Sequence, residues 1–112
     1  MAFPGGKVDE NDEHHEWDML RYAAKREVRE EVGLDLKDDL NYVTNTYFTI
    51  NDDKPLHVIC TLFHCVLNKT DATVFPSTRE VAAYSWLTAD AINQAHNAPP
   101  WLKKAVHFIV CP

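Results

Sequence analysis

The sequence predicts one domain of the α/β or α+β class, in which helices cover a mixed sheet, and three observations support this class. The chain of 112 residues is long enough for one hydrophobic core but not for two. Hydrophobic residues make up 46% and charged residues 25%, which is typical of a globular domain and not of a disordered chain. Segments with the apolar spacing of helices alternate with segments rich in β-branched and aromatic residues.

The first predicted element is a helix from Asp18 to Val32, which follows a Pro-Gly-Gly turn and the polar stretch DENDEHHEWD. Asp18 is expected to be the N-cap, since Asp side chains accept hydrogen bonds from the free N–H groups at a helix start. Gly33 stands where a left-handed residue commonly ends a helix.

Strands and two further helices account for the rest of the chain. Runs of β-branched and aromatic residues predict two strands that resemble a hairpin and one further short strand. Thr88 is expected to cap a short helix, and Pro99 with Pro100 to start the last one. The predicted ranges are 40–50, 56–67 and 81–87 for the strands and 89–96 and 99–110 for the helices.

Charge and cysteine content limit the classes of function. The net charge of −6 argues against binding to nucleic acid or to an anionic membrane surface, which needs basic patches. An acidic protein can still bind phosphates when a divalent cation bridges the two. No signal peptide precedes the chain and no apolar run approaches membrane-spanning length. The three cysteines are odd in number and lack C-x-x-C spacing, so we expect reduced thiols in a cytoplasmic protein.

The first predicted helix breaks its own apolar pattern. Apolar residues at four-residue spacing form the expected core stripe: Leu20, Ala24, Val28 and Val32. Three carboxylates share this side of the helix: Glu27, Glu30 and Glu31. A solvated face would instead lie opposite, with Asp18, Tyr22 and Arg29.

These three carboxylates carry an electrostatic cost. Each pair repels by roughly 0.2–0.5 kcal/mol, and the helix dipole disfavours anions at this end by about another 0.3–1 kcal/mol. A divalent cation would remove the cost, because Mg²⁺ takes carboxylate oxygens, waters and phosphates as ligands. Arg26, four residues before Glu30, is placed to hold that carboxylate. From spacing alone, a metal site and an acidic helix end that faces solvent are equally good interpretations.

Two motifs resemble a known family pattern. FPGGKV, from Phe3 to Val8, followed by REVREEVGL, from Arg26 to Leu34, resembles the Nudix box, G-x5-E-x7-R-E-U-x-E-E-x-G-U with U aliphatic. The second half matches at every fixed position. The resemblance covers residues 3–34 directly and implies the α/β/α sandwich of Nudix domains, with a mixed sheet between helices.

The resemblance also implies a site. The implied ligands of Mg²⁺ or Mn²⁺ are the backbone carbonyl of Gly6 and the side chains of Glu27, Glu30 and Glu31. One of these glutamates, or Glu80 in the TREV run, would activate the attacking water. Arg26 would orient Glu30 or Glu31.

The chain departs from the family pattern before the helix. Gly6 and Arg26 lie twenty positions apart instead of fourteen, so six residues are inserted, within DENDEHHEWD. The first glutamate of the pattern has no direct match. Counting forward from Gly6 gives Asp12, and counting back from Arg26 gives Asp18, and both remain candidates.

The start of the chain is the second departure. Nudix domains usually have roughly two strands ahead of FPGGK, and this chain begins at Met1. The resemblance therefore implies a single domain over residues 1–112 that is N-terminally truncated: a fragment, a chain with a late start, or a shortened member. Sheet edges left unpaired favour pairing with another chain, so a homodimer is expected.

The function implied by the resemblance is that of a divalent-metal-dependent pyrophosphohydrolase acting on acid anhydrides of phosphorus. It would cut a nucleoside diphosphate linked to a moiety X with an activated water, so its partner would be a small nucleotide and neither a nucleic acid nor a membrane. Two alternatives stay open: a non-catalytic Nudix-fold nucleotide-binding or regulatory module, and an inactive fragment of a longer Nudix enzyme.

Overall fold

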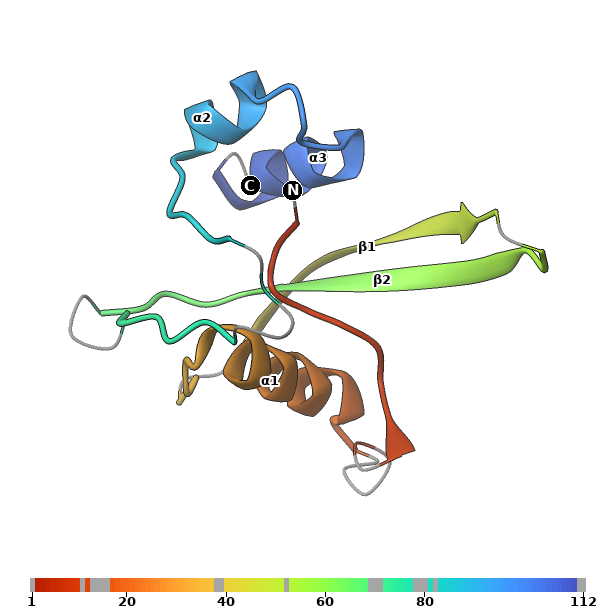
Figure 1. Cartoon of the computed structure of the whole chain (residues 1–112), viewed down its shortest axis with the longest axis horizontal. Coiled ribbons are helices and arrows are strands. Elements are labelled where there is room, and N and C mark those ends of the chain that lie inside the picture. Colours follow the sequence, from red (N-terminus) through yellow and green to blue (C-terminus); the bar gives the residue numbers. More distant parts are fainter. Residues whose placement is uncertain are drawn as a thin grey trace. The chain divides into compact units, whose positions relative to one another are not determined.

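The computed structural model describes residues 2–10, 12, 17–37, 40–51, 53–68, 72–77, 81 and 83–110. The elements in this part of the chain are α1 (Met19–Val32), β1 (Asn41–Ile50), β2 (Leu56–His64), α2 (Ala89–Gln94) and α3 (Pro100–Val110) (Figure 1). Helices combined with an antiparallel pair of strands confirm the α+β class. The chain forms two compact units, one with residues 41–64 and 88–112, the other with residues 2–40 and 65–87.

The first unit contains the β1–β2 hairpin. The strands are antiparallel, with Asn41 opposite His64 and Ile50 opposite Leu56, and a bulge lies between Tyr42 and Thr44. The predicted range of the first strand is confirmed, and β2 ends three residues before the predicted end at residue 67. Neither strand carries a Lys, Arg, Asp or Glu. Contacts between side chains opposite each other on the two strands are therefore expected to stabilise the hairpin, without ion pairs.

Helices α2 and α3 complete this unit. Thr88 caps α2 as predicted, because its Oγ1 accepts a hydrogen bond of 3.1 Å from the N–H of Ala91. Helix α3 begins at Pro100, whose fixed φ suits a first helical position. α3 contacts both α2 and β1, and its buried residues are Leu102, Ala105 and Val106.

The second unit is built around α1. Gly33 ends the helix in the left-handed region, at φ 70° and ψ 17°, as predicted, and its N–H bonds the carbonyl of Arg29. Asp18 is the N-cap by position, but its carboxylate makes no capping bond and accepts instead from Arg21 Nη1 at 3.1 Å. None of the described helices is long and apolar enough to span a membrane.

The predicted apolar stripe of α1 is wrong at its first position, because Leu20 is 46% exposed. The buried residues are Ala23 and Val32, nine positions apart and so on opposite sides of the helix at 100° per residue. Other parts of the chain therefore cover α1 from different sides near its start and near its end, which a single stripe does not predict.

The segment 72–77 covers the C-terminal end of α1. The N–H of Phe75 bonds the carbonyl of Val32 and the N–H of Ser77 bonds that of Glu31, both at 2.8 Å, so two terminal carbonyls of the helix are satisfied. A Cβ at Gly33 would lie 2.8 Å from the Cβ of Phe75, so close packing as well as the left-handed φ requires glycine there.

The predicted strand over 81–87 is wrong for the residues that the structure describes there, which have no strand conformation. Tyr84 and Trp86 are exposed at 52% and 64%. The apolar run predicts a short strand, but in the structure its large side chains face solvent and no partner strand pairs with it among the described residues.

Candidate functional site

The Pro-Gly-Gly turn lies against the acidic end of α1. Figure 1 shows the red N-terminal segment running beside this helix. The N–H of Gly5 donates to Glu31 Oε2 at 3.1 Å. A Cβ at Gly6 would lie 2.6 Å from Glu27 Oε2, closer than carbon and oxygen can approach without moving one of them. The absence of a side chain at Gly6 is therefore what lets the turn reach the Glu27 carboxylate.

Arg26 joins this turn to the helix through one edge of its guanidinium. Nε and Nη2 donate to the two carboxylate oxygens of Asp12, each at 2.9 Å, and Nη2 also donates to the carbonyl of Lys7 at 3.0 Å. The Asp12 side chain is completely buried, and it also accepts from the N–H of Asp9 at 2.8 Å. Bidentate pairs of this kind fix geometry as well as charge.

The other edge of the same guanidinium faces the acids of α1. Nη1 donates to Glu27 Oε1 at 3.0 Å and to Glu30 Oε2 at 3.1 Å, and Asp9 Oδ2 lies 3.5 Å from it. The hydrogen bond to Asp12 is the main cause that raises the pKa of Arg26 above its usual range, with burial opposing the rise and Glu30 adding to it. We call these residues, with Asp12, the Arg26 network.

The sequence offered two aspartates, Asp12 and Asp18, for the position of the first glutamate in the family pattern, and the structure gives them different partners. Asp12 pairs with Arg26, whereas Asp18 pairs with Arg21 at the start of α1. Counting forward from Gly6 along the family pattern therefore gives the aspartate that pairs with Arg26. Two contacts could not be predicted from the sequence, those of the Gly5 N–H and of the Asp9 carboxylate, since neither residue is fixed in the pattern.

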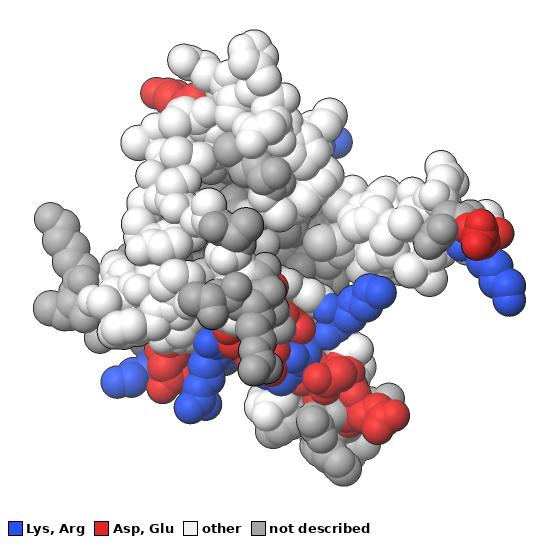
Figure 2. All heavy atoms as spheres, in the orientation of Figure 1, with Lys and Arg blue, Asp and Glu red and all other residues white. Residues whose placement is uncertain are grey.

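The three predicted metal-binding acids differ in exposure. The side chain of Glu27 is 15% exposed and that of Glu30 is 49% exposed, while Glu31 is half-buried. Asp18, Tyr22 and Arg29, which were expected on the solvated face, are exposed. Figure 2 shows acidic and basic side chains interleaved in this part of the surface.

The oxygen atoms available at this end of α1 are of the type that binds a hard divalent cation. Carboxylate oxygens of the three glutamates and backbone oxygens of the glycine turn are the ligand type that Mg²⁺ and Mn²⁺ prefer. The side chains as placed are held by Arg26 and Gly5, and no group of three or more His, Cys, Asp or Glu among the described residues is arranged to hold an ion. Glu80 lies outside the described residues.

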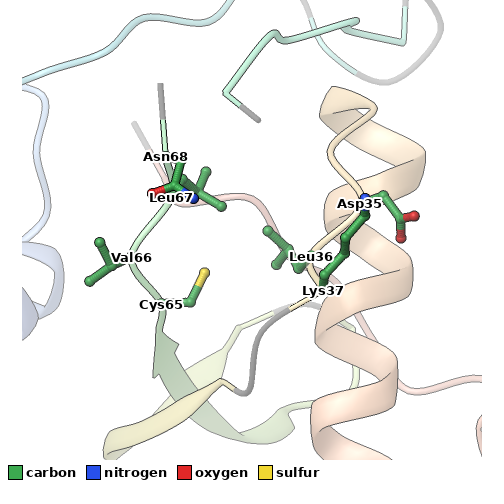
Figure 3. A pocket seen from close by; sticks show the side chains of 7 residues that line it. All are labelled: Asp35, Leu36, Lys37, Cys65, Val66, Leu67 and Asn68. Atoms are coloured by element: carbon green, nitrogen blue, oxygen red, sulfur yellow. The ribbon is translucent and has the colours of Figure 1, made fainter. Parts of the chain in front are cut away.

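A small pocket lies elsewhere in the second unit, between residues 35–37 and 65–68 (Figure 3). The Cys65 sulfur points into it, toward Leu36, whereas Val66 points away. None of the predicted site residues lines this pocket. It is therefore separate from the acidic end of α1.

Comparison with known families supplies one match. The family model described as NUDIX domain matches residues 1–108. Comparison with curated proteins and with solved structures gave no match.

Proposed function

This chain belongs to the NUDIX domain family, and from that premise we propose that it is a divalent-metal-dependent hydrolase of a nucleoside diphosphate linked to a moiety X. The observation that carries the proposal is the contact of Gly5 and Gly6 with the carboxylates of Glu31 and Glu27. It brings the backbone of the glycine turn to two of the acids that the proposal assigns to the cation, and carboxylate and carbonyl oxygens are the ligands that Mg²⁺ prefers.

The proposed ligands are the side chains of Glu27, Glu30 and Glu31 and the backbone carbonyl of Gly6. A bound Mg²⁺ or Mn²⁺ would neutralise phosphate oxygens and lower the pKa of a bound water. Arg26 holds one oxygen each of Glu27 and Glu30, which fixes the direction of both carboxylates. The half-buried Glu27 and Glu31 lie nearest the glycine turn.

Glu80 is the proposed additional acid that receives a proton from the attacking water. Its chain neighbours support the proposal: Ser77 is bonded to the carbonyl of Glu31, and the N–H of Val81 bonds the carbonyl of Ser77 at 3.0 Å. Glu27, Glu30 or Glu31 would take this role if Glu80 does not.

The proposed substrate is a small nucleotide and not a nucleic acid. The net charge of −6 gives no excess of basic groups to neutralise a run of phosphates. We place the protein in the cytoplasm, where the thiol of Cys60 would stay reduced.

We also propose that the domain, residues 1–112, self-associates through the hairpin. Among the described residues β1 and β2 pair only with each other, and neither carries the charged side chains that usually protect a sheet edge. Light scattering after size-exclusion chromatography should give the mass of a dimer. A monomeric mass at all concentrations would reject this part of the proposal.

The test of the main proposal is turnover with Mg²⁺ or Mn²⁺ of dNTPs, ADP-ribose, NADH and dinucleoside polyphosphates, measured by chromatography of the nucleotide products. Glu30→Gln should lower metal-dependent turnover by at least about a hundredfold. Asp90→Asn, in the first turn of α2, removes one carboxylate elsewhere and should leave turnover unchanged. Retained Mn²⁺ binding without turnover of any substrate would reject the enzyme and favour a nucleotide-binding module.

A further inference from the structure

One nitrogen atom, Nη1 of Arg26, lies within 3.5 Å of oxygens from three carboxylates. Glu27 Oε1 lies 3.0 Å from it, Glu30 Oε2 3.1 Å and Asp9 Oδ2 3.5 Å. Two of these oxygens belong to acids that the proposed function assigns to the divalent cation. The guanidinium thus already places a positive charge between groups that a metal ion would have to share.

Arg26 and a cation make different demands on these oxygens. The N–H donors hold Glu27 Oε1 and Glu30 Oε2 at about 3 Å, whereas Mg²⁺ requires oxygens at roughly 2.1 Å in near-octahedral geometry. An ion that drew these two oxygens together would have to replace Nη1. An ion that took only the remaining oxygens would sit within a few ångströms of a like charge.

The guanidinium is not free to leave, because its opposite edge is fixed. Asp12 is fully buried and accepts from both Nε and Nη2, and the carbonyl of Lys7 accepts from Nη2 as well. Moving the whole guanidinium would leave the buried Asp12 carboxylate without its partner, which is costly. The positive charge therefore stays beside the acids when a cation arrives.

We propose that Arg26 is a competitor of the divalent cation for Glu27 and Glu30, and that it keeps the affinity of the protein for the free cation low. This inference rests on the proposed function, since it takes these two glutamates as metal ligands. The effect of Arg26 on cation binding is then opposite to that of a residue that only positions the acids. A positioning arginine strengthens cation binding, whereas a competing arginine weakens it.

The test compares Mn²⁺ binding, followed by the electron paramagnetic resonance signal of the free ion, in variants with unchanged net charge. Arg26→Gln combined with Asp12→Asn removes the guanidinium and its buried counter-charge together, so no buried ion is left unpaired. Arg21→Gln combined with Asp18→Asn makes the same chemical change in the exposed ion pair at the start of the same helix. This variant shows whether loss of any ion pair on α1 changes Mn²⁺ binding by a general effect on the helix.

The Arg26 and Asp12 variant should bind Mn²⁺ at least about tenfold more tightly than the wild-type protein, because a like charge has been removed from the site. The Arg21 and Asp18 variant should bind as the wild type does. Equal or weaker binding in the Arg26 and Asp12 variant would overturn the inference and leave Arg26 a positioning residue. Metal-dependent turnover in the wild type, measured in parallel, shows whether the proposed function itself stands.

A measurement on the wild-type protein does not depend on the variant's folding. Arginine side-chain N–H signals can be followed by ¹⁵N nuclear magnetic resonance while Mg²⁺ is added. The Nη1 signals of Arg26 should change as Glu27 and Glu30 move to the ion, and the Nε signal should persist because Asp12 retains it. Nη1 signals that stay unchanged at saturating Mg²⁺ would contradict competition.

Discussion

Replacing Asp12 with alanine is the perturbation that tests the Arg26 network most directly. The change removes a carboxylate that is completely buried and accepts two hydrogen bonds of 2.9 Å from Arg26 and one of 2.8 Å from the N–H of Asp9. It leaves Nε and part of Nη2 without an acceptor, on a side chain that is 16% exposed. The segment that carries Gly6 would keep its bonds to α1 through Gly5 and Lys7 and lose the two that Asp12 makes.

The expected cost follows from the burial of this pair. Breaking a buried ion pair by removal of one partner typically costs about 3–5 kcal/mol, because the remaining charge is left uncompensated. Water can reach the guanidinium only in part, so we expect about 3 kcal/mol of unfolding free energy to be lost. This is a large share of the roughly 5–15 kcal/mol that stabilises a typical domain.

Urea denaturation monitored by circular dichroism measures this loss. With a denaturant slope of about 1–3 kcal/mol per molar, the midpoint should fall by roughly 1–3 M. Asp18→Ala is the matched control, because it breaks an ion pair of similar length whose side chains are 39% and 60% exposed and should cost only about 0.2–1 kcal/mol. If Asp12→Ala is no more destabilising than Asp18→Ala, the reasoning about burial is refuted.

Three further predictions test other parts of the second unit and the hairpin. Gly6→Ala should weaken Mn²⁺ binding, since its Cβ would displace the Glu27 carboxylate. Gly5→Ala, with open space around its Cβ, should bind Mn²⁺ as the wild type does. Equal effects of the two substitutions on Mn²⁺ binding would exclude this steric account. Gly33→Ala should lower the unfolding free energy by at least about 1 kcal/mol, since it adds a side chain at φ 70°, and an unchanged urea midpoint would contradict this. Burial raises the pKa of the Cys60 thiol above its ordinary value of 9.0, so the folded state holds the proton more tightly and stability should fall as the pH rises above about 9. Cys60→Ala should reduce this alkaline loss when urea midpoints are compared from about pH 8 to 11, and identical pH profiles would show that the thiol is not its cause.

Local chemistry explains which elements the sequence could predict. The range of the first strand, the start of the second, the Thr88 cap and the left-handed Gly33 depend on neighbouring residues, and the structure confirms them. The exposure of Leu20 and the missing strand over the described residues of 81–87 depend on what packs against each segment from far along the chain. Periodicity alone contains no information on that packing.

The candidate site shows the same division. The pattern of acids along α1 and the forward spacing from Gly6 to Asp12 follow from the sequence, and the structure brings Gly6 to Glu27 and Asp12 to Arg26. The approach of Asp9 to Arg26 could not be predicted, because a turn between residues 9 and 12 places it. The hydrogen bonds between Asp9 and Asp12 form this turn, and no fixed position of the pattern corresponds to Asp9.

The pairing of Asp12 with Arg26 has a consequence for how the chain could change in length. The buried pair fixes Asp12 against α1, and bonds from Gly5 to Glu31 and from Arg26 to the Lys7 carbonyl fix the glycine turn there. The number of residues between Asp12 and the start of α1 therefore does not set their relative position. Because doubling the length of a closed loop costs only about 0.6 kcal/mol, added residues there would be inexpensive. This stretch is therefore the place at which a peptide tag or a small reporter could be inserted while the acids stay aligned with the turn.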